Sequence, residues 1–127
     1  MALEEDRKTR DYLYGRLLAI AERIEEVALN VGGESRPTTA ARLMQRFADR
    51  PFSTWRNIKL GLQPYMQRLQ GKRAGFLTNR KKELDMVHSA FLPDEFTSEK
   101  PLSGEFLLGY HCQKQDWRNK RETNNEN

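Results

Sequence analysis

The sequence predicts an all-α protein, a compact bundle of about five helices. Apolar residues recur every three or four positions along most of the chain, which is the spacing of one face of an α-helix. The alternation of apolar and polar residues that is typical of a β-strand is absent from the sequence, as is any internal repeat. The 5 prolines all fall where a helix is expected to begin, bend or end. These observations favour short helices joined by short loops around one core.

The clearest helix is predicted from about residue 10 to residue 29. Alanine, leucine, arginine and glutamate dominate it, and all four are strong helix formers. Its apolar residues are expected on one face: Leu13, Leu17, Ile20, Ile24, Val27 and Ala28. Gly32 and Gly33 are expected to end this helix, because glycine adopts the left-handed conformation that closes a helix.

A second helix is predicted from Thr38 or Thr39 to about Asp49, with Leu43, Met44 and Phe47 as its apolar side. Pro51 stops it, since proline cannot continue a helix hydrogen-bond ladder.

A third helix is expected to follow, with Ser53 as its N-cap. Its predicted inward-facing residues are Trp55, Ile58, Leu62, Tyr65 or Met66, and Leu69. Pro64 lies within this segment, so the helix is expected to kink there or to restart with Pro64 in its first turn.

The segment 71–75 is basic and contains two glycines, and we expect it to be a loop. A fourth helix is predicted from about Thr78 to Leu92. Its expected inward-facing residues are Leu84, Val87, His88 and Phe91.

A last helix is predicted after Pro101, with Ser103 as its cap, and its apolar residues are Phe106, Leu107, Tyr110 and Trp117. We therefore expect a single helical domain over residues 1–117. Residues 118–127 are polar and lack periodicity, which predicts a disordered tail.

The composition favours a cytoplasmic protein. Cys112 is the only cysteine, so an internal disulfide is impossible and a reducing compartment is the simpler interpretation. The sequence has no apolar run approaching the ~18 residues of a membrane span. Its first residues are acidic, unlike a secretion signal.

Charge is strongly segregated along the chain. Residues 1–35 carry a net charge of −3, residues 36–82 carry +11 with Asp49 as their only acid, and residues 83–127 carry −4. The positive charges of residues 36–82 repel one another unless an anion lies near them. Arginine suits a phosphate anion, because its guanidinium can bind two phosphate oxygens at once. The residues predicted to contact nucleic acid are Arg42, Arg46, Arg50, Arg56, Lys59, Arg68, Lys72, Arg73, Arg80, Lys81 and Lys82.

The sequence contains no catalytic or cofactor motif. His88, His111 and Cys112 are too few and wrongly spaced for a transition-metal site, so we expect no metal and no cofactor. A nucleophile, base and orienting group do not occur in a usable arrangement, so we expect no enzyme. Trp55 and Trp117 are expected in the core, with stacking on nucleic-acid bases as the alternative.

Four blocks, taken in order, resemble one family. They are RDYLYGRLLAIAE (10–22), the stretch 38–55 ending in RFADRPFSTW, LQPY (62–65) and PLSGEFLLGY (101–110). Together they resemble the C-terminal part of the large subunit of the type I-C CRISPR interference complex, Cascade. The resemblance spans about residues 10 to 115. In type I-C systems this region is also made separately, from an internal start, as the small subunit.

This chain begins at its own methionine and lacks the rest of the large subunit, which matches that product. The resemblance implies a bundle that packs inside the complex beside the backbone and large subunits and further copies of itself. It also implies contact with guide RNA and target DNA, mainly the displaced single-stranded non-target strand of the R-loop. Recognition of the motif flanking the target belongs to the missing part, and cleavage belongs to a recruited nuclease-helicase.

Two other functions stay open. The short connection at residues 49–52 suggests a helix-turn-helix, and with it a free-standing DNA-binding regulator. Alternatively, the basic segment faces acidic protein surfaces, and the chain acts only in assembly.

Overall fold

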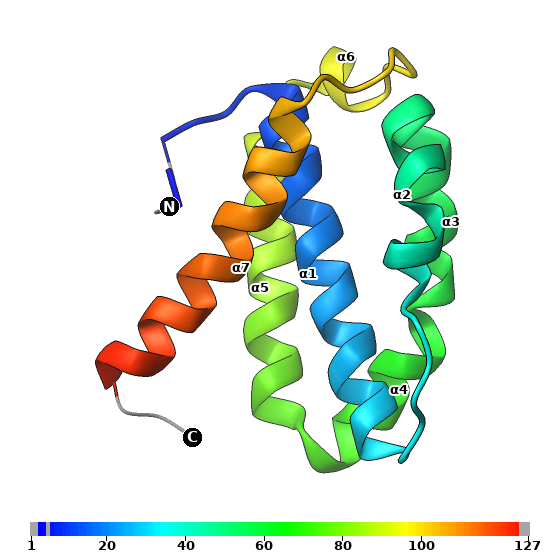
Figure 1. Cartoon of the computed structure of the whole chain (residues 1–127), viewed down its shortest axis with the longest axis vertical. Coiled ribbons are helices and arrows are strands. Elements are labelled where there is room, and N and C mark those ends of the chain that lie inside the picture. The colour runs from blue at the N-terminus through cyan, green and yellow to red at the C-terminus, as the bar shows by residue number, and fades with distance from the viewer. Residues whose placement is uncertain (1–2, 5, 125–127) are drawn as a thin grey trace.

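The computed structural model describes residues 3–4 and 6–124, and all regular structure in this part of the chain is helical (Figure 1). The helices are α1 (Arg10–Val31), α2 (Thr39–Asp49), α3 (Pro51–Gly61), α4 (Gln63–Lys72), α5 (Ala74–Ala90), α6 (Pro93–Phe96) and α7 (Glu105–Asn124). The predicted all-α bundle is confirmed. The two helices beyond the expected five arise from a break before Pro64 and from the single turn of α6.

Helix α1 forms the centre of the bundle. Every residue from 12 to 22 is buried, so this stretch is enclosed on all sides and not on the one face that the spacing predicts. Helices α2, α3 and α4 pack against α1, as do α5 and α7. In Figure 1 the α2–α3 pair lies on one side of α1, and α5 and α7 lie on the other. The residues buried beyond the predicted face include the apolar Leu18 and Ala21 and the charged Arg16 and Glu22.

Two glycines let α1 and α7 cross at very short range. A Cβ added to Gly15 of α1 would lie 2.7 Å from the backbone nitrogen of Tyr110 and closer still to the carbonyl oxygen of Phe106. A Cβ added to Gly109 of α7 would lie 2.9 Å from the carbonyl carbon of Tyr12. Neither backbone has space for a side chain at the crossing, so the two glycines set the distance between these helices.

Several predicted helix boundaries are confirmed. The Thr38 hydroxyl accepts a hydrogen bond from the backbone N–H of Ala41 (3.1 Å), as an N-cap does. Gly33 has a φ of 70°, the left-handed conformation expected after α1. Pro64 lies in the first turn of α4, where its missing N–H costs no helical hydrogen bond.

Four local predictions are wrong. Residues 71–75 are not a loop: only Arg73 separates α4 from α5, because Leu69 and Leu77 are both buried in the core. Ser53 is not an N-cap, since α3 begins at Pro51. His88 is exposed and contacts the ring of Phe96.

The fourth concerns the chain end. Helix α7 continues to Asn124, so the prediction of a disordered tail is wrong for residues 118–124. Residues 125–127 lie outside the described part of the chain.

The segment after α5 is held against α1. The Arg10 guanidinium donates hydrogen bonds to the carbonyl oxygens of Glu95 (3.1 Å), Ser98 (3.1 Å) and Lys100. The Tyr14 hydroxyl donates to the carbonyl oxygen of Phe96, and burial raises the pKa of that phenol well above its usual range. These bonds satisfy carbonyls that a loop would otherwise leave to solvent.

The same segment fixes the start of α3. The Glu99 carboxylate accepts hydrogen bonds from the backbone N–H groups of Phe52 (3.1 Å) and Ser53 (3.2 Å), and from the Ser53 hydroxyl. A carboxylate is favoured at this end of a helix, where the free N–H groups carry partial positive charge. The Leu102 N–H also donates to the carbonyl oxygen of Ala48 (2.8 Å) in α2. Segment 97–102 therefore sets the position of the α2–α3 pair.

Candidate nucleic-acid interface

Helices α2 and α3 present an exposed basic surface. Their apolar sides are buried, with Phe47 in α2 and Trp55 and Ile58 in α3. Because basic residues follow the helical repeat on the other side, they all point to solvent. We call this set the basic hairpin surface: Arg42, Arg46, Arg50, Arg56 and Lys59, all of them exposed.

Few acids offset this surface. Among the residues that the structure describes, no carboxylate forms an ion pair with any of its five members. Asp49 is the only acid on the two helices, and it accepts hydrogen bonds from the Gln45 amide (3.4 Å). The Arg56 guanidinium lies 5.7 Å from the centre of the Phe52 ring, which holds it at the surface without neutralising it. The surface is thus cationic and open to an anion.

Trp55, which we considered for base stacking, lies beneath this surface and is 4% exposed. The core assignment for Trp55 is therefore confirmed. Trp117 is half-buried, and its indole Nε1 donates to Glu83 (2.9 Å).

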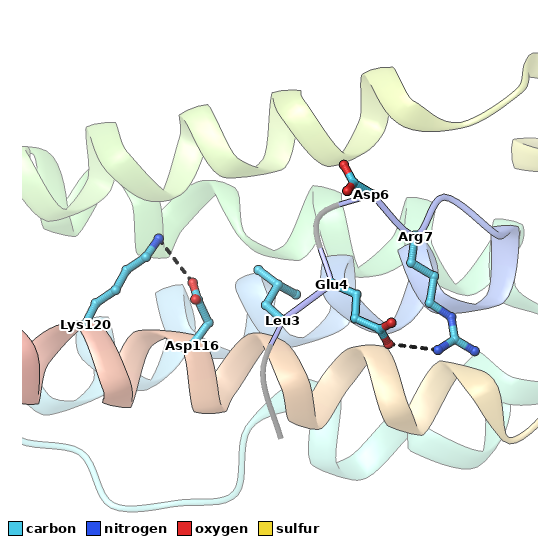
Figure 2. Close-up of a pocket in the computed structure, with 6 residues that line it drawn as sticks. All are labelled: Leu3, Glu4, Asp6, Arg7, Asp116 and Lys120. Carbon is cyan, nitrogen blue, oxygen red and sulfur yellow. Dashed lines mark hydrogen bonds and ion pairs between the residues drawn. The ribbon is translucent and has the colours of Figure 1, made fainter.

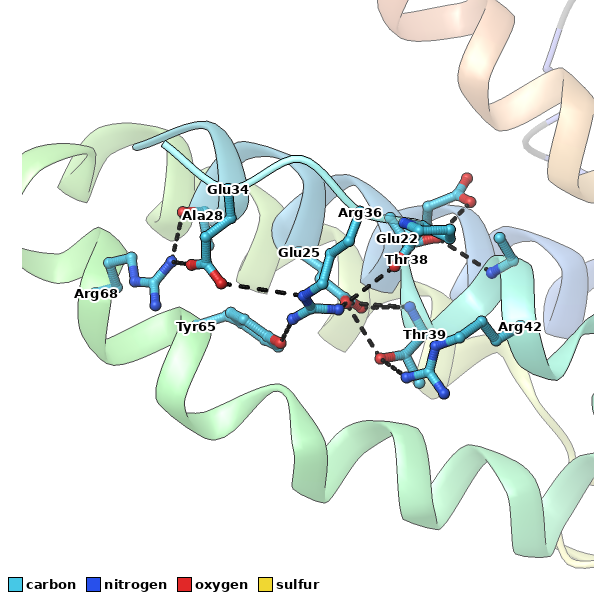
Figure 3. Close-up of polar contacts among 12 residues, drawn as sticks. Glu22, Glu25, Ala28, Glu34, Arg36, Thr38, Thr39, Arg42, Tyr65 and Arg68 are labelled. Atoms are coloured by element: carbon cyan, nitrogen blue, oxygen red, sulfur yellow. Dashed lines mark hydrogen bonds and ion pairs between the residues drawn. The ribbon is translucent and has the colours of Figure 1, made fainter. Parts of the chain in front are cut away.

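Arg68 is also exposed, but its guanidinium takes part in a network of contacts within the chain (Figure 3). Its guanidinium donates to the carbonyl oxygen of Ala28 (2.9 Å) and pairs with the Glu34 carboxylate at 2.6 Å. Arg36 donates to the Tyr65 hydroxyl, and this hydrogen bond raises the pKa of the Arg36 guanidinium. Both guanidiniums lie 5.8 Å from the centre of the Tyr65 ring. The network fastens the loop between α1 and α2 to α4, so Arg68 stabilises the fold.

Two buried glutamates of α1 hold the start of α2 (Figure 3). Both Glu25 oxygens accept from the backbone N–H of Thr39 at 3.0 Å. Glu22 accepts from the Thr38 hydroxyl (3.1 Å), from the Lys114 amino group (3.1 Å) and from the Tyr110 hydroxyl. Burial, together with that bond to Glu22, raises the pKa of the Tyr110 phenol well above its usual range. Buried carboxylates of this kind are stable only when fully hydrogen-bonded.

Sequence reasoning missed Glu22 and Glu25. Both residues lie in a helix that is rich in glutamate and that also contains Glu26, which is partly exposed. The only signal in the sequence is that Glu25 adjoins Ile24 of the predicted core face. That signal does not distinguish a buried glutamate from an ordinary solvated one.

The remaining predicted contacts lie around α5. Lys72, Arg73, Lys81 and Lys82 are exposed. Arg80 is not: it pairs with Glu83 at 2.8 Å and packs on the Trp117 ring at 5.1 Å, and burial lowers the pKa of its guanidinium. The structure therefore separates the predicted set into the basic hairpin surface, a group around α5, and Arg68 and Arg80, each of which pairs with a glutamate of the same chain.

The sequence matches the family model described as CRISPR-associated protein (Cas_Csd1) over residues 1–118, which runs from the first residue through most of α7. The chain belongs to the Cas_Csd1 family. The CRISPR association that the four sequence blocks predict is thereby confirmed, while the type I-C subtype and the small-subunit role stay predictions. A comparison with curated proteins gives no match.

A shallow pocket of this CRISPR-associated protein lies between its N-terminal segment and α7 (Figure 2). It is lined by Leu3, Glu4, Asp6, Arg7, Asp116 and Lys120. Its cations pair with its own acids, Arg7 with Glu4 at 2.9 Å and Lys120 with Asp116 at 3.2 Å. The pocket therefore presents little unpaired charge to a ligand.

Residues 3–4 and 6–124 of this Cas_Csd1 family protein contain neither a metal-binding cluster nor a membrane-spanning helix. No group of three His, Cys, Asp or Glu side chains comes together as a metal site requires. No helix combines the length and apolar character needed to cross a bilayer.

Proposed function

We propose that this CRISPR-associated protein is the non-catalytic small subunit of a type I-C Cascade complex, and that its basic hairpin surface binds nucleic acid without sequence preference. The supporting observation is the set of five exposed cations on α2 and α3 that lack a carboxylate partner among the described residues. The proposed ligand is the displaced non-target DNA strand. Its cytoplasmic partners are the backbone and large subunits, guide RNA and further copies of the chain.

The energetics of target recognition explain why such a surface is useful. Pairing between guide RNA and target supplies the sequence specificity, and exchanging a DNA duplex for an RNA–DNA hybrid is nearly balanced in free energy. A contact that holds the freed strand therefore shifts the balance toward the open state. Five phosphate contacts to a single strand imply that log K falls with log salt at a slope of about −3.5.

The fold keeps this surface in a fixed orientation. Glu22 and Glu25 bind the start of α2, and Glu99 binds the start of α3, all through hydrogen bonds to backbone or hydroxyl groups at those helix ends. Both ends of the hairpin are thus attached to α1 or to segment 97–102. Because the surface is already ordered, binding of nucleic acid does not lose the conformational entropy of ordering it.

A free-standing regulator is less well supported by the geometry. A single residue, Arg50, joins α2 to α3, whereas a helix-turn-helix uses a turn of 3–4 residues. A regulator also requires a stable dimer that prefers one duplex sequence. If the chain binds single strands of unrelated sequence with equal affinity, that result contradicts the function as a regulator.

The proposal is tested by assembling the complex from the other type I-C subunits and guide RNA, with and without this chain. We expect the chain to co-purify, and its omission to lower the fraction of target DNA whose displaced strand reacts with permanganate. Failure to co-purify contradicts the small-subunit role. Co-purification with no change in the displaced strand supports a purely architectural subunit instead.

A further inference from the structure

Three arginines from two helices and the turn between α4 and α5 surround one phenyl ring. The guanidinium carbons of Arg23, Arg73 and Arg80 lie 6.0, 5.4 and 5.1 Å from the centre of the Phe76 ring. Arg23 comes from α1, Arg73 precedes α5, and Phe76 and Arg80 belong to α5. We call these four residues the Phe76 cluster. Sequence reasoning did not include Arg23, because it lies in the acidic part of the chain.

The cluster holds more cations than anions. Arg23 pairs with Glu26 at 3.5 Å, and Arg80 pairs with Glu83 at 2.8 Å. No described carboxylate pairs with Arg73, and the neighbouring Lys72 adds a further positive charge. The electron-rich face of the Phe76 ring attracts cations, which stabilises the guanidiniums beside it.

The like charges in the cluster affect one another. Burial lowers the pKa of the Arg80 guanidinium, and the charge of Arg23 lowers it further, while Glu83 and Asp116 act in the opposite direction. An anion bound beside the cluster offsets its excess of positive charge. A phosphate group suits the position, since planar guanidiniums bind its oxygens two at a time.

We propose that the Phe76 cluster binds a phosphate of single-stranded nucleic acid and forms a second contact, separate from the basic hairpin surface. Aromatic rings combined with arginine are typical of sites that hold single strands without sequence preference. Figure 1 shows α5 on the opposite side of α1 from α2 and α3, so α5, which carries Phe76 and Arg80, is separated by α1 from the helices of the basic hairpin surface. This inference rests on the proposed binding of nucleic acid, but on different residues.

The test compares two double variants, each of which removes two positive charges from the region around α5. Arg23→Gln with Arg73→Gln removes two guanidiniums from the ring. Lys81→Gln with Lys82→Gln removes two exposed charges of α5 for which no ring contact is seen. Binding of a fluorescent oligothymidylate to the full chain is measured by anisotropy over a range of salt concentrations. Thermal melting confirms that both variants are folded.

If the Phe76 cluster binds phosphate, replacing Arg23 and Arg73 flattens the slope of log K against log salt by about 1.4, which corresponds to two lost phosphate contacts. The lysine pair is expected to flatten it by less than about 0.7. Equal effects of the two pairs indicate diffuse attraction and overturn the inference, as does the absence of binding by the wild-type chain.

A third variant separates this inference from the proposed function. If Arg42→Gln with Arg46→Gln weakens binding and the ring pair does not, the hairpin surface stands and the Phe76 cluster fails. The opposite result supports the cluster and contradicts the hairpin surface. Calorimetry with inorganic phosphate tests whether the cluster binds a free anion instead. If the Arg23→Gln, Arg73→Gln variant loses the binding heat for phosphate but binds the oligonucleotide like the wild type, the proposed ligand is not a nucleic-acid strand.

Discussion

Gly15→Ala is predicted to destabilise the protein, although alanine is the better helix former. The new Cβ would lie 2.7 Å from the Tyr110 nitrogen, while ordinary Cβ contacts begin at 3.4 Å, so that atom has to move by about 0.7 Å and the Phe106 carbonyl oxygen by more. Both obstacles are backbone atoms, so all of this part of α7 must move. Overpacking of this kind costs about 3 kcal/mol, and the helix preference of alanine offsets about 1 kcal/mol. The net loss of about 2 kcal/mol corresponds to a melting temperature about 8 °C lower.

Gly71→Ala is the matched control. Gly71 also lies inside a helix, α4, but a Cβ there meets nothing within 4 Å. Only the helix preference remains, so the melting temperature is expected to rise by up to about 4 °C. Circular dichroism at rising temperature measures both variants. If Gly15→Ala melts at or above the wild-type temperature, the close crossing of α1 and α7 described above is incorrect.

Three other predictions follow from individual contacts. Glu99→Ala removes the carboxylate at the start of α3 and should lower the free energy of unfolding by about 1 kcal/mol in urea, and an unchanged midpoint argues against this capping role. Arg68→Ala should also cost about 1 kcal/mol, because it breaks the bonds to Glu34 and Ala28. Arg46→Ala, at a position that is also exposed but pairs with no described carboxylate, should leave stability unchanged; equal effects would contradict the distinction between them. Burial raises the pKa of Tyr14 and Tyr110 above the ordinary value of 10, so their contribution to stability is complete below about pH 10 and declines at higher pH. The urea midpoint should therefore be lower at about pH 11 than at about pH 8, and the difference should be smaller in Tyr14→Phe with Tyr110→Phe; an equal difference in both proteins would contradict the assignment.

The predictions that succeeded depend on local chemistry. Thr38 caps α2 and Pro64 restarts a helix because of interactions within a few residues, which a sequence displays directly. The exposure of Arg42 and Arg46 follows from their spacing relative to Phe47 on the same helix.

The features that the sequence did not predict depend on contacts between distant segments. Arg68 pairs with Glu34 and Arg80 packs on Trp117, and neither pairing leaves a mark in the local pattern. The basic, glycine-containing segment 71–75 favours a loop by composition, but the burial of residues on both sides makes it helical. Net charge along the sequence therefore identifies a basic region, and only the fold shows which of its members face solvent.

The central claim is tested most directly by reversing charge on the basic hairpin surface within an assembled complex. One variant carries Arg42→Glu, Arg46→Glu and Arg56→Glu. The control carries Lys8→Glu, Arg118→Glu and Lys120→Glu, three exposed positions outside α2 and α3. With equal incorporation established, the affinity for target DNA is measured against salt concentration.

We predict that the hairpin variant forms fewer R-loops and flattens the salt slope by about 2, while the control stays close to wild type. If the two variants behave alike, the basic hairpin surface does not bind nucleic acid in the complex.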